Sequence, residues 1–267
     1  MKYVIGSLLG LALCIAAGLA VTRRISAGRG LKPVHKIIIT TAVSFSLIAV
    51  AFFAYLEVYY HADSEAEEYL KSSKRVEVEE YSSMYYFDGP GSSTAVVFYP
   101  GGKVEETAYA PLMHRLAEQG VDCFLLKLPF RMAVFAPNAA DDIISEYDYG
   151  RWYLMGHSLG GIVAAEYNAE NAEDTEGVIL LASYPTKPVP RSERMLSIYG
   201  TEDGCLSMTE YRSARGFWPD VWSQKILNGG NHSGFGYYGP QKGDGEAEIS
   251  AHEQQSLTIR EIKRFMS

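Results

Sequence analysis

Residues 151–161 of this 267-residue chain have the sequence RWYLMGHSLGG. The apolar run at its start predicts a β-strand, and the alanine-rich residues that follow Ser158 predict a helix. A serine on the sharp turn between them has no room for side chains two positions before and after it, and Gly156 and Gly160 stand there. Such a turn presents the hydroxyl at the carboxyl end of the strand, beside the main-chain N–H of Leu159. The pattern therefore predicts a nucleophile and an oxyanion donor; a glycine-rich packing turn is the alternative.

A nucleophilic serine needs a general base and a carboxylate that orients the base. In a parallel sheet both come from the ends of later strands. The strand predicted at residues 195–199 leads to Asp203, and the next predicted strand leads to His232 in a glycine-rich loop. The chain order Ser158, Asp203, His232 therefore predicts a catalytic triad, with Glu202 as the alternative acid.

The second oxyanion donor is expected in the loop that follows the strand predicted at residues 94–99. A proline and two glycines occupy this loop. The main-chain N–H of Gly102 is the first candidate and that of Lys103 the second, while a plain tight turn is the alternative. His157, which flanks the nucleophile, is expected to pack or to form a hydrogen bond rather than to act as the base.

The chain from residue 76 to residue 267 alternates short β-like runs with helical patterns, which is typical of an α/β fold with a mostly parallel sheet flanked by helices. The predicted strands cover residues 76–87 (a strand or hairpin), 94–99, 121–128, 151–155, 178–182, 195–199 and 221–227. The predicted helices cover residues 108–119, 138–146, the segment from the elbow to about 168, and 253–266.

The N-terminal 60 residues have a different character. Residues 3–22 and 37–56 are two charge-free stretches of 20 residues, each long enough as a helix to cross a bilayer core. The loop between them, residues 23–36, holds five basic residues and no acidic one, so the positive-inside rule places it in the cytoplasm. Both termini, and the domain after residue 60, are then extracytoplasmic, and the protein is a multi-pass protein of the cell membrane.

Two alternatives compete with this membrane hairpin. Both helices could be buried in a soluble core, or residues 1–20 could be a cleaved signal peptide, in which case the second span would send the domain into the cytoplasm. Residues 61–75 are charged and rich in alanine and glutamate, and they are expected to form either a helical stalk or a flexible linker.

Charge divides the chain in the same way. The net charge is −8, but residues 1–56 carry +6 and the remainder carries −14. An acidic globular part argues against a nucleic-acid partner. The three cysteines, Cys14, Cys123 and Cys205, lack metal-ligand spacing, although a Cys123–Cys205 disulfide is conceivable from the residues alone.

Four strings carry a resemblance to a known family: YPGGKV at 99–104, PFRMAVF at 129–135, GHSLGG at 156–161 and GGNH at 229–232. With them, residues 76–267 resemble the α/β-hydrolase superfamily, and within it a group of small bacterial hydrolases without a large cap. Members of the superfamily are mostly esterases, lipases, thioesterases, amidases or peptidases that work through an acyl-enzyme. The resemblance implies no metal or organic cofactor.

The same resemblance implies a sheet order in which the strands of Cys123 and Asp203 lie on opposite sides of the nucleophile strand, which disfavours a disulfide. Many relatives insert a cap where this chain has only residues 183–194, with three prolines. The site is therefore expected to be open and to admit a small-molecule or acylated substrate. Its walls are expected to include four aromatic residues, with the protein core as their alternative location: Phe130, Phe135, Tyr184 and Phe235.

The function expected from these residues is hydrolysis of a carboxylic ester, thioester or amide by a carboxylesterase-like, membrane-anchored serine hydrolase. Two alternatives use the same sequence features. One is a binding or scaffold protein with an idle triad on a hydrolase fold, because a fold alone does not establish activity. The other is an acyltransferase that passes the acyl group to an acceptor other than water.

Overall fold

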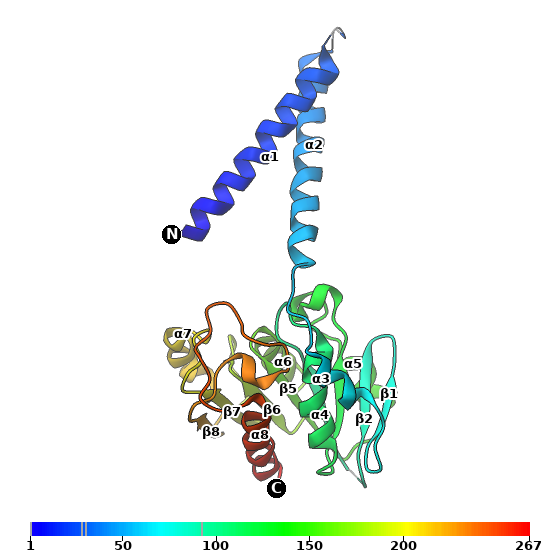
Figure 1. Cartoon of the computed structure of the whole chain (residues 1–267), viewed down its shortest axis with the longest axis vertical. Helices are drawn as coiled ribbons and strands as arrows, with labels where there is room; N and C mark the ends of the chain where they lie inside the picture. The colour runs from blue at the N-terminus through cyan, green and yellow to red at the C-terminus, as the bar shows by residue number, and fades with distance from the viewer. Residues whose placement is uncertain (1, 28, 30, 92) are drawn as a thin grey trace. The chain divides into compact units, whose positions relative to one another are not determined.

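The computed structural model describes residues 2–27, 29, 31–91 and 93–267, with only the backbone described for residues 2–11. It divides into two compact units, Met1–Val58 and Tyr59–Ser267 (Figure 1). Residue 1 of the predicted membrane hairpin and residues 28 and 30 of its predicted basic loop lie outside the described residues.

The first unit contains two helices, α1 (Lys2–Ser26) and α2 (Pro33–Leu56). They pack on each other through small residues, and the hydroxyl of Thr40 donates a hydrogen bond to that of Thr22 over 2.9 Å. Among the described residues, α2 is the one helix long and apolar enough to cross a membrane. Its apolar side chains are mostly exposed, as at Phe45 (72% exposed), so α2 is not a buried core helix.

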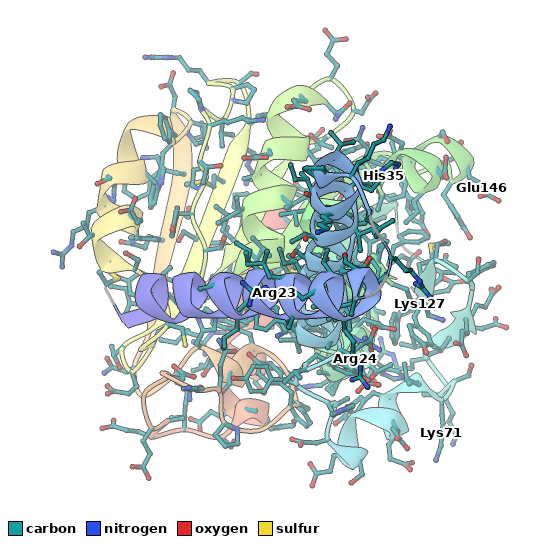
Figure 2. The ribbon with its side chains drawn as sticks, turned by 90° about the horizontal axis from the view of Figure 1, so that it is seen from above. Arg23, Arg24, His35, Lys71, Lys127 and Glu146 are labelled. Carbon is teal, nitrogen blue, oxygen red and sulfur yellow. The ribbon has the colours of Figure 1, made fainter. Side chains whose placement is uncertain are left out.

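Basic side chains gather where these two helices are joined. Arg23 and Arg24 lie in the last turn of α1, and Lys32 precedes the first turn of α2, which carries His35 (Figure 2). Basic side chains therefore flank the segment that joins the two helices.

Eight strands of the described chain form one sheet in the order β1-β2-β4-β3-β5-β6-β7-β8. Only β1 and β2 are antiparallel to their neighbours; the other pairs are parallel. The strands are β1 (Glu77–Glu80), β2 (Met84–Asp88), β3 (Thr94–Tyr99), β4 (Asp122–Leu126), β5 (Arg151–His157), β6 (Gly177–Leu181), β7 (Arg194–Gly200) and β8 (Val221–Leu227). Strand β5, which leads to Ser158, lies inside the sheet and is buried along almost its whole length.

Helices cover both faces of this sheet (Figure 1). The apolar sides of α4 and α8 pack into the core on one face, and α5 and α6 pack on the other. The helices are α3 (Ser64–Glu67), α4 (Ala110–Ala117), α5 (Asp141–Glu146), α6 (Leu159–Glu170), α7 (Met208–Ser213) and α8 (Ala251–Met266). The 3-10 turns are η1 (Glu68–Leu70), η2 (Glu106–Tyr109), η3 (Pro129–Arg131), η4 (Ala133–Phe135), η5 (Ala214–Phe217) and η6 (Ser233–Phe235).

The observed elements differ from the predicted ones mainly at their ends. The predicted helix 108–119 begins as the 3-10 turn η2, and the predicted helix 138–146 becomes an α-helix only at Asp141, after turns that start at Asn138. β4 and β7 lie on opposite sides of β5, as the resemblance implies. Cys123 and Cys205 are accordingly free thiols.

Residues 61–75 differ from the expected stalk or linker because they pack on the globular unit. The N–H of Asp63 donates to the carbonyl of Tyr237 over 2.8 Å, and Ala66 in α3 is fully buried. Tyr69 and Leu70 contact the core on the α4 face. The apolar members of this charged segment stabilise its position by burial, which composition alone does not reveal.

Candidate active site

Ser158 stands on the turn between β5 and α6 with φ 52° and ψ −122°, a conformation that costs a non-glycine residue free energy. A Cβ atom on Gly156 would lie 2.5 Å from the carbonyl carbon of Gly160, so the turn tolerates no side chain there. The N–H of Ser158 donates to the carbonyl of Leu181 over 2.9 Å, and the Ser183 hydroxyl donates to the Ser158 carbonyl over 2.7 Å. The end of β6 therefore holds the strained serine in place.

His232 and Asp203 come together at the carboxyl ends of β8 and β7. The His232 Nδ1 lies 3.1 Å from Oδ1 and 3.0 Å from Oδ2 of Asp203, and the two side chains are only 3% and 2% exposed. Oδ1 of Asp203 also accepts the amides of Cys205 and Leu206 over 2.9 and 2.8 Å. These bonds hold the carboxylate facing Nδ1, which leaves Nε2 of His232 to exchange a proton with another group.

Ser158 and His232 line the same cavity, of about 210 Å³, at the end of the sheet. The cavity is therefore the place where the nucleophile, the base and a substrate carbonyl can meet. Its other lining residues are Leu159, Ile162, Ala182, Ser183, Tyr184, Cys205, Leu206 and Ser207.

The two candidate oxyanion donors of the glycine-rich loop, Gly102 and Lys103, have different surroundings. The N–H of Lys103 donates to the carbonyl of Arg131 over 2.8 Å and is thus occupied. Gly102 lies directly against the residue that follows the nucleophile, since a Cβ on it would be 2.9 Å from Cδ2 and 3.4 Å from Cβ of Leu159. Leu159 is the first residue of α6, so its own N–H has no partner within the helix.

The four residues predicted to form the walls of the site lie in different parts of the structure. Tyr184 lines the cavity. Phe235 is fully buried and packs against His157 with ring centroids 5.6 Å apart. It therefore belongs to the protein core, which is the alternative location given for it above. Phe130 and Phe135 lie on the turns η3 and η4, are 38% and 46% exposed, and are outside the lining of the serine cavity.

Several residues that line the cavity are not predicted from the sequence. Ile162 is one helical turn after Ser158 on α6, and Leu206 and Ser207 follow the acid. The helical repeat of four residues could have identified Ile162, because residues i and i+4 share a face. Leu206 and Ser207 lie in the irregular loop after Asp203, and no periodic pattern in the sequence predicts which residues of a loop face a cavity.

A buried hydrogen-bonded chain connects the elbow to the glycine loop. The Tyr109 hydroxyl lies 2.8 Å from Nδ1 of His157 and accepts the N–H of Gly101 over 3.2 Å. Burial, and in smaller part the neighbouring His232, lowers the pKa of His157 well below its ordinary value. His157 is therefore a neutral packing and hydrogen-bonding residue, which is the role expected for it.

This low pKa predicts a loss of stability in mild acid. Above about pH 6.5 His157 is neutral in both the folded and the unfolded state; below it, only the unfolded state binds the proton, so the free energy of unfolding falls. When the pH falls from 6.5 to 5.5, the free energy of unfolding of His157→Gln is expected to decrease by about 1 kcal/mol less than that of the parent. Denaturant titrations read by tryptophan fluorescence measure this, since all three tryptophans lie in the globular unit. Equal losses in both proteins would contradict it.

Asp244 ties the base and acid loops together and has no counterpart in the sequence analysis. Oδ1 accepts the amides of His232 and Gly204, each over 3.1 Å, and Oδ2 accepts the amide of Ser233 over 2.8 Å. One half-buried carboxylate thus holds the backbone on both sides of the His232–Asp203 pair.

We expect Asp244→Ala to lower kcat about 10- to 100-fold, because a displacement of about 1 Å at a catalytic group has an effect of this size. KM should change less, because Asp244 is outside the cavity lining. Asp244→Asn keeps one acceptor oxygen, so its kcat should lie between the kcat of the parent and that of Asp244→Ala. Glu246→Ala, which removes an exposed carboxylate nearby, is the control. Steady-state kinetics on a p-nitrophenyl ester measure both constants, and a kcat for Asp244→Ala equal to that of Glu246→Ala would refute the role.

Among the described residues, no cluster of three or more His, Cys, Asp or Glu side chains is arranged to hold a metal ion.

Comparisons with known proteins agree with this architecture. The model of the alpha/beta hydrolase family matches residues 95–256, more than half of the chain. A comparison with curated protein sequences finds no match.

Solved structures share the fold at low sequence identity. A novel esterase from Mycobacterium tuberculosis has 12% identity and a TM-score of 0.54, over 76% of this chain and 96% of that one. Naproxen esterase from Bacillus subtilis has 10% identity and a TM-score of 0.53, over 76% and 95%. A protein from Thermus thermophilus has 12% identity and a TM-score of 0.53, over 72% and 99%. At such identities the likeness establishes the fold alone.

Proposed function

Because the chain belongs to the alpha/beta hydrolase family, we propose that it is a membrane-anchored serine hydrolase that cleaves a carboxylic ester, thioester or amide. The observation that carries this proposal is the pairing of Asp203 with His232, which lines the same cavity as Ser158. A buried imidazole whose Nδ1 faces a carboxylate is the base that a serine nucleophile requires.

In the proposed mechanism, Oγ of Ser158 attacks the substrate carbonyl while Nε2 of His232 takes the hydroxyl proton. Asp203 stabilises the imidazolium that forms. The amides of Leu159 and Gly102 hold the oxyanion, and each is worth about 3 kcal/mol in the barrier. His232 then gives the proton to the leaving group, and water attacks the acyl-enzyme to release the acid.

A fluorophosphonate probe tests this proposal, because it reacts with activated serines. The parent should be labelled and should hydrolyse p-nitrophenyl butyrate, whereas Ser158→Ala should do neither and His232→Ala should be labelled far more slowly. Labelling of Ser158→Ala would remove Ser158 from its role. A folded parent that reacts with neither reagent would favour the idle scaffold.

We also infer that residues 3–22 and 37–56 form a membrane hairpin with residues 23–36 in the cytoplasm and the catalytic domain outside. The packing of α1 on α2, the exposed apolar surface of α2 and the basic turn between them support this inference.

Protease added to intact cells tests the orientation: the catalytic domain should be removed. A domain that survives until the cells are lysed would contradict it. The mass of the purified protein tests the other alternative, because loss of about the first 20 residues would identify a cleaved signal peptide.

A further inference from the structure

The globular unit exposes an apolar loop, residues 129–137, that follows β4. Its sequence is PFRMAVFAP, with Arg131 as its one charged residue. Three large apolar side chains in it are well exposed, namely Phe130 (38%), Val134 (48%) and Phe135 (46%). Soluble proteins seldom gather large exposed apolar side chains in one short segment without a binding role.

The backbone of this apolar loop is held in its shape despite strain. Phe130 and Arg131 have φ values of 54° and 55°, in the left-handed region that costs residues with a Cβ about 1–2 kcal/mol each. The carbonyl of Arg131 accepts the N–H of Lys103, and its own N–H donates to the carbonyl of Leu128 over 3.0 Å. The exposed side chains thus project from a fixed turn.

The apolar loop also adjoins the start of the globular unit. The guanidinium of Arg131 lies 3.5 Å from the centre of the Tyr59 ring. The next residue, Tyr60, donates its N–H to the carbonyl of Lys103 over 2.8 Å. Tyr59 therefore contacts the apolar loop directly, and Tyr60 is connected to it through Lys103, whose N–H donates to the carbonyl of Arg131.

Covalent chain length then restricts where this surface can be in a membrane-anchored protein. Tyr59 is the third residue after Leu56, the end of α2, and three residues reach at most about 10 Å. The headgroup region on each side of a bilayer is about 5–8 Å deep. If α2 crosses the membrane, Tyr59 lies in or next to the headgroups, whatever the angle between the helix and the domain.

The apolar loop also lies against Gly102, the candidate oxyanion donor. Sδ of Met132 is 3.4 Å from the position of a Cβ on Gly102. The turn η4 packs against α6, the helix that begins after Ser158. Insertion of this loop into the membrane would therefore bring the start of α6, and Ser158 before it, close to molecules in the same leaflet.

From these observations we propose that residues 129–137 insert into the bilayer interface and that the substrates are acyl esters of membrane-resident amphiphiles. The substrate class rests on the proposed serine hydrolase function, and the insertion rests on the membrane anchor.

The insertion is tested without any activity measurement, in the full chain reconstituted into nanodiscs. Phe135→Trp adds a tryptophan to the apolar loop, and lipids with brominated acyl chains should quench its added fluorescence at least twofold. Ile226→Trp, at a 45% exposed residue of β8 at the sheet edge, is the matched control and should show no such quenching. Equal quenching in the two variants would overturn the insertion.

The substrate class is tested with two esters: p-nitrophenyl butyrate in solution and a fluorogenic diacyl phospholipid within the nanodisc. Val134→Asp should reduce hydrolysis of the phospholipid at least tenfold and leave that of the soluble ester within twofold, because a carboxylate resists transfer into the interface. Val134→Leu should retain both activities. Val221→Asp, at a 55% exposed valine of β8, is the control.

The outcomes separate the two proposals. A parent that hydrolyses the soluble ester but not the phospholipid, or a Val134→Asp variant that matches Val221→Asp on the phospholipid, would overturn the substrate class alone. A parent inactive on both esters and unlabelled by fluorophosphonate would overturn the hydrolase function, while quenching of Phe135→Trp would still uphold the insertion.

Discussion

Replacing Ser158 by alanine is expected to reduce kcat on p-nitrophenyl butyrate by ~10⁴-fold or more, with little change in the free energy of unfolding. The loss is large because the hydroxyl forms the covalent bond, and no other group at the turn replaces it. Stability should persist because the main chain of Ser158 donates to the carbonyl of Leu181 and accepts the hydroxyl of Ser183, and alanine keeps both bonds. Initial rates and a denaturant titration measure the two quantities.

Two further variants make this result specific. Ser158→Ala combined with His232→Ala should be no slower than Ser158→Ala alone, because the two residues act as one unit. Ser207→Ala is the matched control, since Ser207 lines the same cavity and its hydroxyl accepts the N–H of Glu210 at the start of α7. The kcat of Ser207→Ala should be less than tenfold below that of the parent. A Ser158→Ala protein with more than a tenth of the parent activity would exclude an acyl-enzyme at this residue.

The sequence predicts the elbow well because the steric demand there is local. A serine with φ 52° between a buried strand and a helix requires glycines at fixed offsets, and that requirement is visible in five residues. The pairing of Asp203 with His232 follows almost as directly. Both residues come immediately after strands of a parallel sheet, and β7 and β8 are neighbours, so their carboxyl ends meet at one edge.

Asp244 could not be predicted in this way. It lies in an irregular segment between η6 and α8, and its bonds go to main-chain amides of two distant loops. Backbone amides carry no residue identity, so no sequence pattern marks a carboxylate that accepts them. The same reason hides the bond between the amide of Lys103 and the carbonyl of Arg131, which occupies the amide of one of the two candidate oxyanion donors.

The aromatic residues show a second limit. Phe130, Phe135 and Phe235 are equally apolar, yet Phe235 is buried in the core and the other two are exposed. Composition gives only the tendency of an apolar side chain to leave water, and the fold determines what covers it. Residues 61–75 illustrate the converse, because their charge suggests a solvated segment while Ala66 and its aromatic neighbour Tyr69 pack on the domain.

Gly160→Ala is expected to destabilise the globular unit by about 3–5 kcal/mol and to lower kcat at least 100-fold, although it adds only a methyl group. A Cβ on Gly160 would lie 2.7 Å from the carbonyl carbon of Tyr99 and would overlap the carbonyl oxygens of Tyr99 and Pro100. These are backbone atoms of a buried strand and its loop, so α6 would have to move away, and Ser158 with it.

Gly216→Ala is the matched control for this variant, since a Cβ there would meet no atom within 4 Å and its φ lies outside the left-handed region. That variant should be neutral or slightly more stable, because alanine restricts the unfolded chain more than glycine does. Denaturant midpoints and initial rates of both variants measure the difference. Equal stability of Gly160→Ala and Gly216→Ala would show that α6 does not lie against β3 as closely as the elbow requires, and the position of the nucleophile would then need another explanation.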